Sequence, residues 1–105
     1  MHCRYFALAF GFVALACTAQ EASRHSHKPS AGYVPDAATA IRIAVAIWEP
    51  IYGRKEISDQ APYKARLIGT VWIVEGTLPP NMLGGVALAE IAKDDGRVHR
   101  VSHGK

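Results

Sequence analysis

The sequence predicts an α+β domain in which one helix packs on an antiparallel sheet of about four strands. Apolar residues recur at helical spacing in the stretch after Asp36, and the chain from residue 63 onward consists of strand-length apolar segments separated by glycine and proline turns. The chain has 105 residues, of which 50% are hydrophobic and 20% charged. This length and balance are typical of one small globular domain, which we place at residues 33–105.

The N-terminal segment 1–16 has the pattern of a signal peptide. Arg4 precedes an apolar run from Tyr5 to Ala16 that is too short for a membrane span, which needs about 20 residues. Ala16 suits ordinary signal peptidase, whereas Cys17 after it suits bacterial lipoprotein processing, although the usual order of the residues before the cysteine is reversed here. We therefore expect export, either to the periplasm or as a lipoprotein anchored to the membrane through Cys17.

Residues 17–32 are rich in Ser, Ala, His and Lys and have no apolar period, which predicts a flexible tether. If the leader is cut before Cys17, Cys3 leaves with it and no intramolecular disulfide can form. Loss of Arg4 lowers the formal net charge of +3 by one. The basic residues are spread along the chain rather than gathered in a patch, so the sequence predicts no nucleic-acid partner.

The main helix is expected to begin after Asp36, which is a good N-cap residue. Pro50 lacks a backbone donor and predicts a kink or an end near Glu49, and Gly53 is expected to end any last turn. A short helical turn is expected at 56–60. The residues predicted to form the buried face of the helix are Ile41, Ala44, Ile47, Trp48 and Ile51.

Four strands are expected after this helix. In the first, Tyr63, Ala65 and Leu67 alternate with Lys64 and Arg66, as in a half-buried strand. A turn at Gly69 leads into the apolar segment 70–78, and a Pro-Pro loop follows, with a bulge expected at the glycine pair 84–85. The segments 86–93 and 97–104 then form a hairpin around the Asp-Gly pair at 95–96.

Glu75 and Glu90 are the carboxylates most suited to act as a catalytic acid and base across paired strands. A glutamate on a strand is more often a solvated ion-pair partner, here of Lys64 or Arg100, and we give that interpretation more weight. No nucleophile motif and no phosphate-binding loop is visible. The pattern therefore predicts a protein without a catalytic site or a cofactor.

The histidines do not form a recognisable metal site. His99 and His103 would share one face of a strand about 13 Å apart, too far to bind one metal ion. His25 and His27 lie in the predicted tether and have no third ligand nearby. We expect no bound metal.

Trp48 and Trp72 are expected to fill the core, with Trp72 or Tyr63 as an alternative contributor to a binding surface. Arginine and aromatic side chains anchor many protein interfaces. The residues predicted to bind a protein partner are Tyr63, Arg66, Trp72, Arg97 and Arg100.

The segments "VPDAATAIRIAVAIWEPIYG", "VWIVEGTLP" and "GGVALAEIAKDDGRV" and the terminal "HGK" together resemble bacterial immunity proteins of the nuclear transport factor two fold. The resemblance covers Tyr33 to Lys105 and implies a short, cone-like version of that fold, with a curved sheet around one helix. It also implies a non-catalytic protein that neutralises a cognate protein toxin by binding it directly. Because the leader predicts export, we expect the toxin to act in the periplasm. The sequence does not indicate an oligomeric state.

An alternative reading is a small periplasmic enzyme or ligand-binding protein of the same fold, of the isomerase or dehydratase type. Such a protein needs several polar groups that converge in an apolar pocket inside the cone. This sequence offers few, and fold alone does not decide between the two functions.

Overall fold

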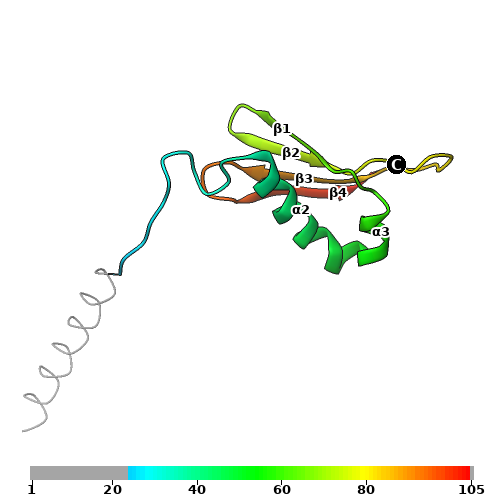
Figure 1. The fold of residues 1–105 in the computed structure, drawn as a ribbon, viewed down its shortest axis with the longest axis horizontal. Helices are drawn as coiled ribbons and strands as arrows, with labels where there is room; N and C mark the ends of the chain where they lie inside the picture. The colour runs from blue at the N-terminus through cyan, green and yellow to red at the C-terminus, as the bar shows by residue number, and fades with distance from the viewer. Residues whose placement is uncertain (1–23, 105) are drawn as a thin grey trace, which may run out of the picture.

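The computed structural model describes residues 24–104, in which α2 (Ala37–Tyr52) and α3 (Arg54–Ser58) cover one face of an antiparallel sheet (Figure 1). The strands are β1 (Lys64–Ile68), β2 (Val71–Glu75), β3 (Ala87–Ala92) and β4 (Val98–His103), in that spatial order. The predicted α+β fold of one main helix on four strands is confirmed. The predicted leader 1–16 and Cys17 lie outside the described residues.

Local signals determine both ends of α2. The Asp36 carboxylate accepts a hydrogen bond from the Thr39 backbone N–H at 2.8 Å. Hydrogen bonding with the side chain of Thr39, and then with its backbone, lowers the pKa of Asp36. Gly53, with φ of 100°, ends the helix and donates its N–H to the Glu49 carbonyl. The helix passes through Pro50 to Tyr52, so an end near Glu49, one of the two alternatives predicted for Pro50, is wrong, while the predicted end at Gly53 is confirmed.

The buried face of α2 is the row formed by Ala40, Ala44 and Trp48. Ile51 was expected in this face but is 57% exposed. In the last turn it is Tyr52 that packs on the sheet, with its ring centroid 5.0 Å from that of His103.

The core lies between this helix row and the inner face of the sheet, which carries Trp72, Val74, Ala87, Ala89 and Ile91. The small side chains of Ala87 and Ala89 leave room for the helix, and Trp48 fills that space. Its ring lies 5.9 Å from that of Tyr63, and its indole N–H donates to the Leu88 carbonyl. The predicted packing of Trp48 from the helix against the sheet is confirmed.

Two details of the strands differ from the expectation. Leu67 lies opposite Trp72 on the inner face but is 43% exposed, because β1 is an edge strand. The glycine pair 84–85 precedes β3 and makes no bulge in it; the register shift lies instead between Glu90 and Ile91, where β4 contains the extra residue His99.

A strap formed by residues 28–34 joins the domain before Tyr33, where order was expected to begin. The Lys28 ammonium donates to the Asp94 carboxylate at 2.6 Å, and this hydrogen bond raises the pKa of Lys28. Tyr33 and Val34 donate their backbone N–H groups to the carbonyls of Asp94 and Lys93. The strap is therefore attached to the turn between β3 and β4. None of the helices within residues 24–104 is long and apolar enough to span a membrane.

Candidate functional site

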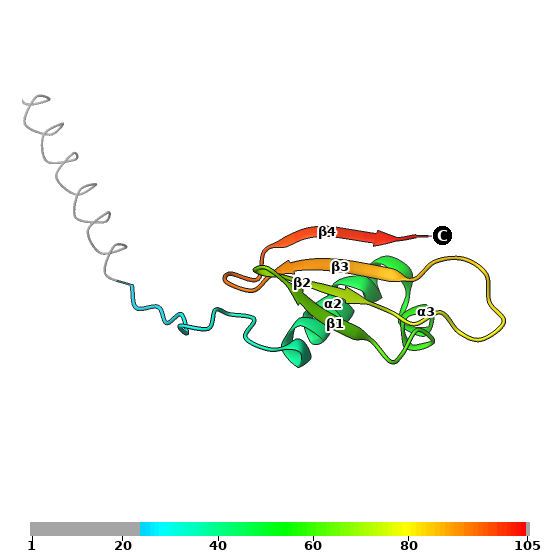
Figure 2. The same cartoon turned by 90° about the horizontal axis from the view of Figure 1, so that it is seen from above.

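The face of the sheet turned away from α2 is the first candidate surface, and we call it the outer face (Figure 2). Side chains alternate between the two faces of a strand, so the residues next to the buried Trp72 and Val74 point outward. The register then places Arg66, Ile73, Glu90 and Arg100 in one row across the four strands. No described helix covers this face, on which Val71, Ile73 and Leu88 are half-buried.

Two ion pairs flank the aliphatic residues of the outer face. An Arg66 Nη1 atom lies 3.1 Å from Glu75 Oε1, and an Arg100 Nη1 atom lies 3.6 Å from Glu90 Oε2. Both glutamates are thus ion-pair partners, as expected; of the two predicted partners, Arg100 pairs with Glu90, whereas Glu75 pairs with Arg66 and not with Lys64. The carboxylate of each glutamate is engaged by an arginine on the neighbouring strand.

The other predicted binding residues lie in different places. Arg97 is exposed at the turn between β3 and β4. Trp72 is only 8% exposed, and its indole N–H donates to the Val34 carbonyl at 2.8 Å. The surface role considered for Trp72 is therefore corrected: the strap covers this side chain, and it belongs to the core.

Tyr63 is half-buried beside Trp48, and its hydroxyl donates to the Ile57 carbonyl at 2.8 Å. Burial, and then the nearby negative charge of Glu49, raises the pKa of Tyr63. Because its hydroxyl is already used within the domain, Tyr63 offers a partner only part of its ring.

The second candidate surface is a hollow of about 620 Å³ at the end of the sheet far from the strap. It lies between α3 and the loop 76–86. The residues that line it are Glu56, Asp59, Gln60, Leu78, Pro79, Met82, Leu83, Gly84, Gly85, His103 and Gly104.

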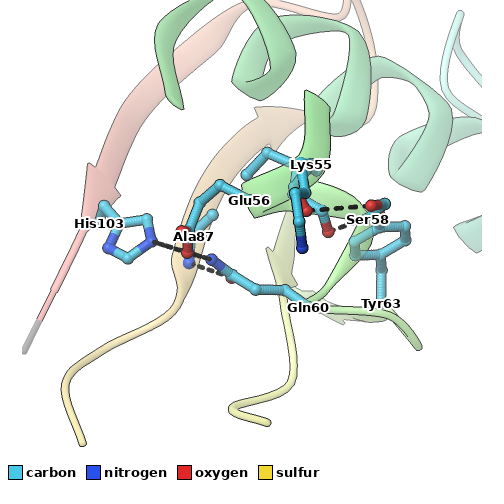
Figure 3. A network of polar contacts seen from close by, with 8 residues as sticks. Lys55, Glu56, Ser58, Gln60, Tyr63, Ala87 and His103 are labelled. Atoms are coloured by element: carbon cyan, nitrogen blue, oxygen red, sulfur yellow. Dashed lines mark hydrogen bonds and ion pairs between the residues drawn. The ribbon is translucent and has the colours of Figure 1, made fainter. Parts of the chain in front are cut away.

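Gln60 organises the polar wall of this hollow and is 1% exposed (Figure 3). Its side-chain oxygen accepts the Ala87 backbone N–H at 2.8 Å. The amide nitrogen must then point the other way, where it lies 3.2 Å from Glu56 Oε2 and 2.9 Å from His103 Nε2. Since an amide nitrogen only donates, His103 Nε2 is placed to accept this hydrogen bond.

These hydrogen bonds limit the chemistry that the cluster of Glu56, Gln60 and His103 can perform. His103 Nε2 lies 3.7 Å from Glu56 Oε2, and its lone pair is engaged by Gln60. A general base needs that lone pair free to reach a substrate proton. Reasoning from sequence missed the cluster because Gln60 stands 43 residues from His103 along the chain, and no local pattern marks either residue.

The histidines outside the hollow are dispersed. His25 and His27 are exposed at the start of the described chain, and His99 is the extra residue of β4. Within residues 24–104, no three His, Cys, Asp or Glu side chains are grouped so that they could hold a metal ion.

Comparison with known proteins gives two matches. Residues 39–105 match the model of a family described as NTF2 fold immunity protein. A protein of Escherichia coli K12, named uncharacterized protein YhhH, is 36% identical over 73 residues, which are 69% of this chain and 58% of that protein. No solved structure matches the chain. With its helix on an open four-stranded antiparallel sheet and this match over most of the folded domain, the chain belongs to the NTF2 fold immunity protein family.

Proposed function

We propose that this protein protects a bacterial cell by binding a cognate protein toxin directly, without catalysing a reaction. The observation that carries the proposal is the outer face, an uncovered sheet surface on which half-buried aliphatic side chains lie between two arginine–glutamate pairs. Family membership supports the same function, since the family is described as immunity proteins.

The outer face has the composition of a protein interface. Protein interfaces combine an apolar centre with a polar rim, and arginines supply many of their strongest contacts. Here Ile73 lies at the centre, while Arg66 and Arg100 stand on the edge strands with side chains that are 64% and 62% exposed. Exposed ion pairs contribute little to stability, so both arginines can change partner on binding at small cost.

The interior of the domain supports a binding role over the enzymatic alternative. The space between helix and sheet is filled by Trp48, Val74, Ala89 and Ile91, all at 0% exposure. At the hollow, the side chains of Glu56 and His103 are held in hydrogen bonds with Gln60. An active site inside a cone requires open apolar space with several free polar groups.

Our proposal places the protein outside the cytoplasm, because residues 1–16 have the sequence pattern of a signal peptide. The protein is then either free in the periplasm or anchored by a lipid on Cys17. A toxin that acts in the periplasm would meet it there.

The proposed function is tested with the product of the gene that neighbours this one. That product is directed to the periplasm of a sensitive strain, with and without this protein, and growth is followed. We expect growth arrest without this protein and recovery with it. Arrest under both conditions contradicts the proposal.

The binding surface is tested with the same toxin by calorimetry. At least one of Arg66→Ala, Arg97→Ala and Arg100→Ala is expected to weaken binding by about 1–2 kcal/mol, because each removes an arginine anchor. Arg42→Ala, which removes an exposed arginine from α2, is the matched control and should leave binding unchanged. If all three sheet variants bind like the parent, the outer face is not the interface.

A further inference from the structure

The wall of the hollow formed by the loop 76–86 is unusually apolar for a solvent-exposed surface. Leu83 is 98% exposed, Met82 56% and Leu78 40%. Single exposed apolar residues are common, but several gathered on one projecting loop typically mark a site of interaction. Figures 1 and 2 show this loop extending beyond the end of the sheet.

Hydrogen bonds hold the loop in this position. Gly76 donates its N–H to the Ala87 carbonyl at 3.0 Å, and Thr77 donates to the Gln60 carbonyl at 2.7 Å. Met82 closes a turn by donating to the Pro79 carbonyl at 3.2 Å. With both its base and its turn bonded in this way, the loop directs the apolar side chains outward, where a partner can bury them.

The opposite wall of the hollow carries negative charge. Glu56 and Asp59 line it, and none of the described lining residues is a lysine or arginine. The carboxylate of Asp59 is paired with Lys55 at 2.9 Å. Glu56 has no lysine or arginine partner within ion-pair distance among the described residues, and the Nε2 atom of His103, its one ion-pair neighbour there, is engaged by Gln60. The Glu56 side chain is 55% exposed and open to a cation from outside.

We infer that the hollow binds a segment of a partner protein in which an apolar side chain stands next to an arginine or lysine. The apolar side chain would pack against Met82 and Leu83, and the cation would pair with Glu56. The inference rests on the proposed function, in which that partner is the toxin. The loop begins at Gly76, directly after Glu75 of the outer face, so the two surfaces are adjacent along the chain.

The chemistry of the hollow is tested without the toxin. The ¹⁵N-labelled protein is titrated with a short blocked peptide of alternating leucine and arginine, and separately with its leucine–glutamate counterpart. We expect the first peptide to shift the amide resonances of Glu56, Gln60 and 82–85, and the second to leave them in place. Equal binding of both peptides, or shifts confined to other parts of the protein, would overturn the inference.

Two variants separate the contribution of the apolar contact to peptide binding from that of the charged contact. Leu83→Ser and Glu56→Gln should each weaken binding of the leucine–arginine peptide at least about fivefold, since contacts of this kind supply most of the affinity at an interface. Glutamine at 56 can still accept the hydrogen bond from Gln60. Leu67→Ser and Glu49→Gln change an exposed leucine and a paired glutamate elsewhere, and should leave peptide binding unaltered.

The growth assay distinguishes failure of this inference from failure of the proposed function. Both hollow variants are expected to lose protection against the toxin in the strain that the parent protects. If the parent protects and both variants protect equally well, the hollow does not bind the toxin and the inference is wrong, although the proposed function stands. If the parent does not protect, the proposed function fails, and the peptide titration alone decides what the hollow binds.

Discussion

Gln60 connects more of the structure than any residue singled out from the sequence. It is buried, and its side chain bonds to residues of α3, β3 and β4, while its carbonyl accepts the N–H of Thr77 at the base of the loop. A buried amide is stable only when its polar atoms are paired, and no described buried side-chain nitrogen or oxygen lacks a partner. Gln60 thus positions both walls of the hollow.

A substitution at Gly76 tests how tightly the structure packs around Gln60. A Cβ atom at Gly76 would lie 2.4 Å from Gln60 Oε1 and 2.9 Å from Gln60 Cβ, so Gly76→Ala must displace the glutamine. We expect this substitution to lower the free energy of unfolding by about 1–3 kcal/mol, measured by urea denaturation. Gly104→Ala is the matched control, because a Cβ there meets nothing within 4 Å. Equal stability of the two variants would show that Gln60 moves freely.

The central relation at the scale of elements is that of α2 to the sheet. Small residues contribute to the core from both sides, Ala40 and Ala44 from the helix and Ala87 and Ala89 from β3. Trp48 then occupies the wider space beside Tyr63. The contact between α2 and the sheet therefore depends on the large side chain of Trp48 among small neighbours.

Trp48→Ala would leave a cavity in that contact that the small neighbours cannot fill. The expected loss is about 3–5 kcal/mol of unfolding free energy, a large part of the stability of a small domain. Urea denaturation followed by circular dichroism measures it. Ile51→Ala in the same helix, at a site that is 57% exposed, should change stability by less than about 0.5 kcal/mol. A Trp48→Ala protein that unfolds with the parent would contradict the packing described here.

At the scale of the whole molecule, different structures lie at the two ends of the sheet. The strap is attached to the β3–β4 turn at one end of the sheet, and the loop 76–86 lies at the other (Figure 1). The hollow is lined by residues of that loop. The stretch between Cys17 and Lys28 reaches at most roughly 40 Å when fully extended. If Cys17 carries a lipid, the turn end lies near the membrane, and the hollow is free to face away from it.

Export and anchoring are tested by fractionating cells and weighing the mature protein. We expect cleavage of the leader and, if the lipoprotein interpretation holds, a lipid mass on Cys17 and recovery with the membranes. Cys17→Ser should then move the protein from the membrane fraction to the soluble fraction or block its processing. An uncleaved cytoplasmic protein contradicts export, and an unmodified Cys17 contradicts the lipid anchor alone.

The sequence by itself determined the features that depend on neighbouring residues. Asp36 and Gly53 set the two ends of α2 because an N-cap and a positive-φ glycine act within one helical turn. The Asp-Gly pair at 95–96 likewise placed the last hairpin, where Arg97 donates its N–H to the Asp95 carboxylate. The pattern of the whole domain was also sufficient for the family resemblance, which the match over 39–105 confirms.

Only the tertiary structure decided the features that join distant parts of the chain. Trp72 belongs to the core because Val34, 38 residues earlier, accepts its indole N–H. Glu75 pairs with Arg66 because the register of β1 on β2 brings them together. The hollow depends on bonds from Gln60 to residues 27 and 43 positions later. Spacing along the chain shows none of these contacts, since each exists only once the helix, the sheet and the strap have packed together.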